Sequence, residues 1–92
     1  MGEKAKMIAW MDDLINVYTV TSKFEESFKG VRAINLNFQG RIILSSGIDK
    51  LADAVEEKLC KVVREGEKFP YEFSFYYRNV LFVQVEESEV IT

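Results

Sequence analysis

Two stretches of the chain repeat apolar residues at the spacing of an amphipathic helix. In residues 4–16 they recur three, four and seven apart, with Asp12 and Asp13 on the opposite side. This first stripe comprises Met7, Ile8, Trp10, Met11, Leu14 and Ile15. The second begins after Ser46, a favoured N-cap, and ends before Gly66, a favoured residue just past a helix. It comprises Ile48, Leu51, Ala52, Val55, Leu59, Val62 and Val63, and it predicts a helix over 46–66.

Between these helices the pattern changes to that of β-strands. Residues 17–24 are rich in β-branched side chains and predict a strand. The capping box from Ser22 to Glu25 favours a short helix over 23–29 instead. Residues 31–39 alternate apolar and polar side chains, which predicts a strand with one buried face. Gly40-Arg41 then predicts a tight turn, and residues 42–44 predict a short strand or an extended run into the next helix.

The C-terminal part, which begins FPYEFSFYY, also alternates with a period of two. One face of residues 69–77 is aromatic throughout and comprises Phe69, Tyr71, Phe73, Phe75 and Tyr77. After a break, the same alternation returns in Leu81, Val83 and Val85. A two-residue loop would pair Phe73 with Gln84 and mix apolar and polar side chains on each face. The loop Arg78-Asn79-Val80 avoids this, so the pattern predicts three loop residues, with Asn79 or Val80 in the special backbone conformation.

The predicted order is helix, strand, strand, helix, strand, strand, or αββαββ. Strands joined by hairpins and two helices that each need one covered face predict an α+β domain. Both helices would pack on one side of a four- or five-stranded, mostly antiparallel sheet. The 92 residues suffice for one domain over 1–92 with a single core. Residues 88–92 are expected to fray.

Composition limits the partners and the cellular compartment that we expect for the chain. The chain has 12 Lys and Arg against 15 Asp and Glu, a net charge of −3 that argues against broad binding to duplex nucleic acid. Cys60 is the only cysteine, so no internal disulfide forms and a reducing compartment fits best. No apolar run approaches the roughly 18 residues of a membrane span, and the N-terminus lacks the apolar region of a signal peptide. We expect a cytoplasmic protein without membrane contact.

Little in the sequence points to an enzyme or a metal site. The chain contains no histidine, which removes Ser-His and Cys-His catalysis and most zinc sites. We therefore expect no catalytic residue, metal ligand or cofactor. Cys60 fits a small buried or half-buried residue of the second helix better than a nucleophile. Ser45-Ser46-Gly47 fits ordinary capping of that helix better than an anion site.

The last hairpin supplies the best candidate for a binding site. With three loop residues, Tyr76 and Phe82 form a pair of rings on the otherwise polar face. The rim of this pair comprises Glu72, Ser74, Gln84, Glu86 and Arg78. Glu72 would lie opposite Glu86, a like-charge pairing that indicates either a site for a basic partner or cation, or neutralising Lys and Arg side chains nearby. An aromatic centre with a polar rim is typical of protein-binding patches. Alternatively, both rings lie beneath the N-terminal helix or only stabilise the hairpin.

The runs INLNFQGRIILSSGIDKLADAVEEKL and KFPYEFSFYYRNVLFVQVEE carry a resemblance that covers roughly residues 31–87. In layout they resemble small accessory proteins of phages and prophages from Gram-positive bacteria. The resemblance implies a strand, a helix and a terminal hairpin. It also implies a protein that acts by binding a host protein, as inhibitors of CRISPR effectors and of other defence nucleases do, and it brings no active site.

We therefore expect a non-enzymatic protein-interaction module that binds and inhibits or modulates a host protein through the last hairpin. Homodimerisation through the same surface or a strand edge is compatible with this role. The alternative is a small nucleic-acid-binding module that uses exposed aromatics for stacking and the bases around the first hairpin. Those bases are Lys23, Lys29, Arg32 and Arg41.

Overall fold

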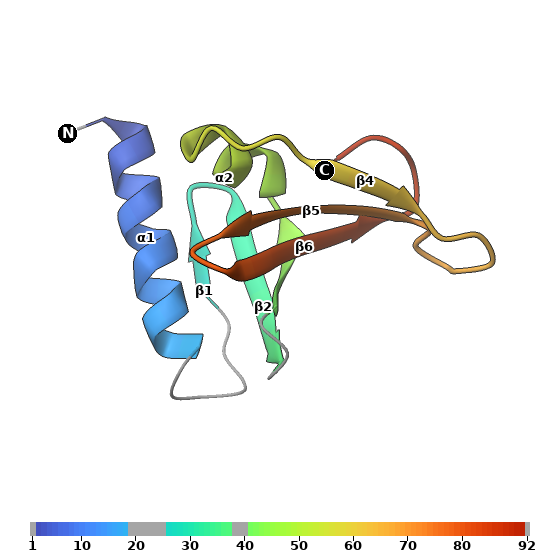
Figure 1. Ribbon diagram of the computed structural model, residues 1–92, viewed down its shortest axis with the longest axis horizontal. Helices are drawn as coiled ribbons and strands as arrows, with labels where there is room; N and C mark the ends of the chain where they lie inside the picture. The colour runs from blue at the N-terminus through green and yellow to red at the C-terminus, as the bar shows by residue number, and fades with distance from the viewer. Residues whose placement is uncertain (1, 19–25, 38–40, 92) are drawn as a thin grey trace.

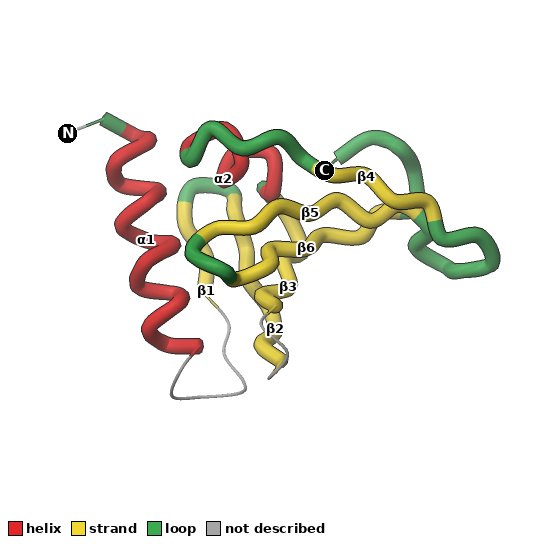
Figure 2. The backbone as a smooth tube through the Cα atoms, in the orientation of Figure 1, coloured by secondary structure: helices red, strands yellow, loops and turns green. Residues whose placement is uncertain are grey.

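The computed structural model describes residues 2–18, 26–37 and 41–91, which form two helices and six strands (Figures 1 and 2). In order they are α1 (Glu3–Tyr18), β1 (Glu26–Phe28), β2 (Val31–Asn37), β3 (Arg41–Ser46), α2 (Ile48–Ala54), β4 (Cys60–Val63), β5 (Tyr71–Tyr77) and β6 (Val80–Glu86). The predicted α+β class is confirmed. Within the described residues, three strands lie on each side of α2 in the chain, where the predicted αββαββ order has two.

The strands form one mixed sheet in the order β1-β2-β3-β6-β5-β4. Antiparallel pairing joins β1 to β2, β2 to β3, β6 to β5 and β5 to β4. The central pair, β3 and β6, is parallel and connects the two antiparallel halves. The expectation of four or five strands was therefore too low, because two short segments, β1 and β4, extend the sheet at its edges.

Both helices pack on the same face of the sheet, and the core lies beneath them. The largest fully buried side chains are Phe82, Met11, Leu14, Ile42, Ile48, Leu51, Gln84 and Val31. Phe75 and Phe82, which pair across β5 and β6, stack with ring centroids 5.2 Å apart. At the β1 edge, Trp10 of α1 stacks on Phe28 at 5.7 Å. Each fully buried large apolar side chain stabilises such a core by roughly 1.5–3 kcal/mol.

In the N-terminal half the structure differs from the prediction at residue 17, where a strand was expected to begin. α1 continues through Val17 and Tyr18, so a strand over 17–24 is wrong at its first two residues. Adding residues to an existing helix is favourable enough to override a weak β preference. The short helix considered for 23–29 is also wrong, because residues 26–28 form β1. The remainder of these two predictions, residues 19–25, lies outside the described residues.

The first predicted hairpin is confirmed in its described part. β2 covers 31–37 of the expected strand over 31–39, and β3 makes the run at 42–44 a strand. The two strands pair antiparallel, with a register shift near Ala33. The turn expected at Gly40-Arg41 lies outside the described residues at Gly40, while Arg41 begins β3.

The long helix predicted over 46–66 is wrong beyond Ala54. Val55 leaves the helix, and Glu56 takes the left-handed conformation with φ 58°. The Glu57 N–H donates to the Ala52 carbonyl at 2.9 Å, and the Glu56 N–H donates to the Asp53 carbonyl at 3.2 Å. This pair of bonds is a Schellman motif, which usually places glycine at the left-handed position. Because glutamate stands there instead, the sequence carries no stop signal at this point.

The start of α2 also differs from the predicted cap. Gly47, not Ser46, is the N-cap residue, with φ 85° and no side-chain cap. Ser46 Oγ instead donates a hydrogen bond to the Gly30 carbonyl at 3.0 Å. A Cβ on Gly47 would lie 2.7 Å from Val31 Cα, so close approach to β2 as well as the positive φ requires glycine here.

The C-terminal hairpin has a two-residue loop, so the predicted three-residue loop is wrong. Tyr77 pairs with Val80, and Arg78 and Asn79 both have positive φ, 52° and 63°. Two consecutive left-handed residues make the turn that matches the twist of a hairpin, and Asn is favoured there. The special conformation expected at Asn79 is confirmed. The slip of one residue turns every β6 side chain to the face opposite to the predicted one.

Replacing Glu56 with glycine tests where α2 ends. Glycine relieves the left-handed strain at this position, so Glu56→Gly should raise the free energy of unfolding by about 0.5–1 kcal/mol, despite greater freedom in the unfolded chain. Within a continuous helix the same change would lower it by about 0.5–1 kcal/mol. Urea denaturation followed by circular dichroism measures the difference. Glu57→Gly is the matched control, and it should destabilise because Glu57 has no positive φ.

Candidate functional site

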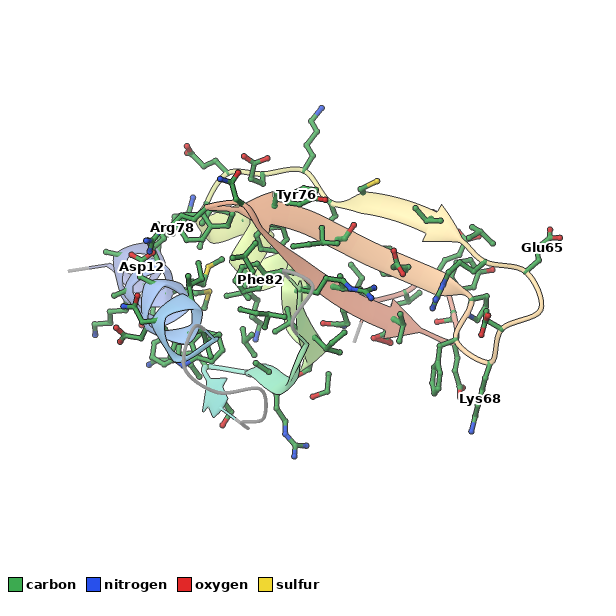
Figure 3. All side chains as sticks on the ribbon, turned by 60° about the horizontal axis from the view of Figure 1, so that its bottom comes forward. Asp12, Glu65, Lys68, Tyr76, Arg78 and Phe82 are labelled. Carbon is green, nitrogen blue, oxygen red and sulfur yellow. The ribbon has the colours of Figure 1, made fainter. Side chains whose placement is uncertain are left out.

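The two aromatic residues of the predicted patch lie on opposite faces of the sheet (Figure 3). Tyr76 is 66% exposed, whereas Phe82 is 0% exposed and belongs to the core beneath the helices. In the observed register Tyr76 pairs with Leu81, and Phe82 pairs with Phe75. Placing Phe82 beside Tyr76 on the polar face was therefore wrong. Phe82 cannot contact a partner of the folded protein.

Gln84 and Glu86, two predicted rim residues, lie on the core face rather than around a surface patch. Gln84 is fully buried, and its Oε1 accepts a hydrogen bond from the Ile48 N–H at 3.0 Å. Its Nε2 donates to Glu86 Oε2 at 2.8 Å. The amide oxygen thus satisfies the N–H of Ile48, one of the first N–H groups of α2 that have no partner within the helix. This contact also takes up one of the N–H groups that an anion at Ser45-Ser46-Gly47 would use.

Glu72 lies on the same face as Tyr76 but not opposite Glu86. It pairs with Val85 on one side and Val62 on the other, while Glu86 pairs with Tyr71. The like-charge pairing predicted from the wrong register is therefore absent. Arg64 Nε lies 3.7 Å from Glu72 Oε1, so a base does neutralise this carboxylate.

Arg78 joins the hairpin turn to α1. Its Nη1 donates to Asp12 Oδ1 at 3.0 Å, and the Tyr77 hydroxyl donates to the same oxygen at 2.9 Å. Figure 3 shows Asp12 and Arg78 together at this end of the molecule. Burial and the hydrogen bond to the Asp12 carboxylate, with its charge, raise the pKa of Tyr77 above the usual 10.0, and Arg78 opposes the shift. The three side chains form a structural clamp between α1 and the turn.

The face of the sheet away from the helices carries a second apolar cluster, which we call the open face. Cross-strand partners share a face, so the register aligns the side chains in rows. One row contains Arg41, Leu81 and Tyr76, and the next contains Ile43, Val83, Ser74 and Cys60. A third contains Val85, Glu72 and Val62. Val83 is buried yet separate from the helix-side core, while Ile43, Leu81 and Val85 are half-buried.

The open face has an aliphatic centre and a polar border. Tyr76 and Val62 (43% exposed) project from β5 and β4, on either side of the shorter Ser74. Arg41 and Glu72 stand at its border. Sequence reasoning found Tyr76 and Glu72 but missed Ile43, Leu81, Val83 and Val85, which it assigned to the core side or to a run before a helix. The apolar residues on both faces of residues 80–85 were the available signal, because a strand covered on one side alternates with polar residues.

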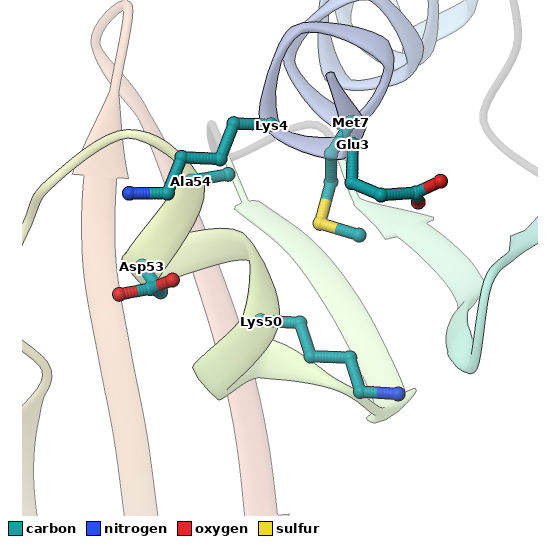
Figure 4. A pocket seen from close by; sticks show the side chains of 6 residues that line it. All are labelled: Glu3, Lys4, Met7, Lys50, Asp53 and Ala54. Carbon is teal, nitrogen blue, oxygen red and sulfur yellow. The ribbon is translucent and has the colours of Figure 1, made fainter.

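Other candidate sites are weaker. A shallow pocket of about 160 Å³ lies between the first turn of α1 and α2 (Figure 4). Its lining mixes charged and apolar side chains, namely Glu3, Lys4, Met7, Lys50, Asp53 and Ala54. Cys60, expected to be buried or half-buried in a helix, is exposed on β4. Among the residues that the structure describes, no three His, Cys, Asp or Glu side chains cluster as metal ligands, and no helix is long and apolar enough to span a membrane.

Comparisons of this chain with protein-family models, with curated proteins and with solved structures found no match. The chemistry of the open face is therefore the basis for assigning a function.

The hydrogen bond of Tyr77 in this clamp predicts that the free energy of unfolding falls at alkaline pH. Because the pKa of Tyr77 is raised in the folded protein, the unfolded chain releases this proton first, and stability falls as the pH rises above 10.0. Tyr77→Phe removes the hydroxyl and should cost about 0.5–1.5 kcal/mol at pH 7. This difference from the wild type should hold up to about pH 10 and shrink above it. Urea titrations from pH 7 to 11 measure it, and a difference that stays constant to pH 11 would contradict the assignment.

Proposed function

We propose that the chain is a non-enzymatic protein-interaction module that binds another protein with the open face of its sheet. One observation carries the proposal: an apolar cluster on the face away from both helices, with Tyr76 66% exposed above it. Apolar patches larger than a few hundred Å² are uncommon on monomeric proteins and typically mark interaction sites. On the open face the exposed Tyr76 and Val62 adjoin the half-buried Ile43, Leu81 and Val85. An exposed tyrosine beside aliphatic side chains, with Arg41 and Glu72 at the border, has the composition of a binding hot spot and its rim.

The resemblance in layout to phage accessory proteins supports a particular class of partner. A bacterial host protein that the module inhibits or modulates fits it best, and a CRISPR effector or another defence nuclease is an example. The non-enzymatic part of the proposal draws on the absence of histidine from the sequence.

A second candidate is binding of single-stranded nucleic acid, which one arrangement favours. Tyr76 and Arg41 lie in one row, separated by Leu81, so a base could stack on the ring while the guanidinium contacts a phosphate. Glu72 on the same face and the net charge of −3 oppose it. Titration with oligonucleotides at two salt concentrations separates the two candidates, because binding to phosphates weakens steeply with salt.

Replacing Tyr76 with serine tests the proposed function. Tagged wild-type protein captures partners from a lysate of Gram-positive bacteria, and their affinity is then measured with purified components. Tyr76→Ser should weaken binding by more than about tenfold, since a central tyrosine commonly contributes over 1.4 kcal/mol. Its circular dichroism melt should stay close to that of the wild type, because the ring is exposed.

Two further variants control this experiment. Val90→Ser removes an equally exposed apolar side chain outside the sheet and should leave binding unchanged. Phe82→Ser should lose about 3–5 kcal/mol of stability, as expected for a core ring. A partner that Tyr76→Ser retains as tightly as the wild type does would rule out the open face as its binding site.

A further inference from the structure

β4 is an edge strand, and the positions of its backbone groups determine what it could pair with. It pairs with β5 on one side and ends the sheet on the other. The Arg64 N–H donates to the Pro70 carbonyl at 2.7 Å, one step beyond the pairing of Val63 with Tyr71. Hydrogen-bonded and non-hydrogen-bonded pairs alternate along an antiparallel ladder. Val62 therefore bonds to β5, and the N–H and C=O groups of Lys61 and Val63 point away from the sheet.

The side chains of β4 give this edge little protection against pairing. Val62 and Val63 are 43% and 52% exposed, one on each face. No residue of β4 is a proline or has positive φ, so neither a missing donor nor a bulge interrupts the edge. The one lysine, Lys61, lies 3.4 Å from Glu89 of the same chain, and this carboxylate offsets its charge. At the other edge of the sheet, β1 is shorter, with three residues.

We propose that β4 pairs antiparallel with β4 of a second copy of this chain, with Val62 of each copy on the two-fold axis. In this register Lys61 of each copy pairs with Val63 of the other, so all four outward N–H and C=O groups of each copy are satisfied. A register centred on Lys61 would set like charges directly opposite each other, which is unfavourable.

Pairing of this kind would produce a continuous twelve-stranded sheet, since each copy contributes six strands. A two-fold axis perpendicular to the sheet keeps the same face of both copies on the same side. The two open faces would then lie side by side, and a dimer would present Tyr76 twice on one surface. This inference concerns the edge of the sheet and does not depend on what the open face binds.

Disulfide trapping tests the register. In a Cys60→Ser background, Val62→Cys places the two sulfurs on the axis, where paired Cα atoms lie about 4.5 Å apart and a disulfide fits. Lys61→Cys in the same background is the matched control, because its two Cα atoms would lie about 8–9 Å apart, too far for a disulfide. Mild oxidation should crosslink the first variant and not the second. Crosslinking of the second variant alone, or of neither, would overturn the proposed register.

Proline substitution tests the pairing itself in the unmodified chain. The Val63 N–H points outward, so Val63→Pro should convert dimer to monomer in sedimentation equilibrium without breaking the ladder to β5. Val62→Pro removes a bond to β5 and should instead lower the melting temperature. Wild-type protein that remains monomeric up to hundreds of micromolar would refute the proposal. Each Val63→Pro monomer should still bind the partner of the open face through Tyr76. Loss of dimerisation and loss of partner binding can therefore be measured separately, which distinguishes failure of this proposal from failure of the proposed function.

Discussion

The parallel pairing of β3 with β6 is the contact on which the rest of the structure depends. It is the join between the two antiparallel halves of the sheet. On the helix side it aligns Ile42 with Phe82 and Leu44 with Gln84, which builds the core under α1 and α2. On the other side it aligns Arg41 with Leu81 and Ile43 with Val83, the centre of the open face. Parallel pairing requires a long connection, and here α2, β4 and β5 provide it.

Gln84 shows how a buried polar residue can fix a register that hydrophobic pattern alone would reject. An amide with 0% exposure destabilises a core unless its hydrogen bonds are satisfied. Here Oε1 accepts from the first N–H of α2 and Nε2 donates to Glu86. A shift of β6 by one residue would separate Gln84 from α2 and leave that N–H unpaired. In the sequence, the pairing of Gln84 with Phe73 argued against a two-residue loop. In the fold, the hydrogen bonds of Gln84 favour the register that this loop produces.

Sequence reasoning succeeded where one signal was strong and unopposed. α1, β2, β3 and the existence of the last hairpin follow from periodicity, and Tyr76 was recognised as facing away from the aromatic core. It failed where a residue adopts a backbone conformation that its type does not indicate. Glu56 adopts a conformation that glycine usually takes, so α2 stops early and the remaining valines of the apolar stripe form an edge strand. The length of the loop after Tyr77 was predicted wrongly because an arginine, such as Arg78, gives no sequence signal for a left-handed backbone conformation.

The open face follows from apolar residues that the core does not need. Phe82 and Val80 supply the helix side of β6, yet Leu81, Val83 and Val85 are apolar as well. An antiparallel sheet with one wet face normally alternates apolar with polar residues, and strands that are apolar on both faces are typical of sheets covered on both sides. In the described residues both helices lie on one side. The second side of β3 and β6 therefore has the apolar composition of a covered sheet face, and Tyr76 is the most exposed side chain beside it.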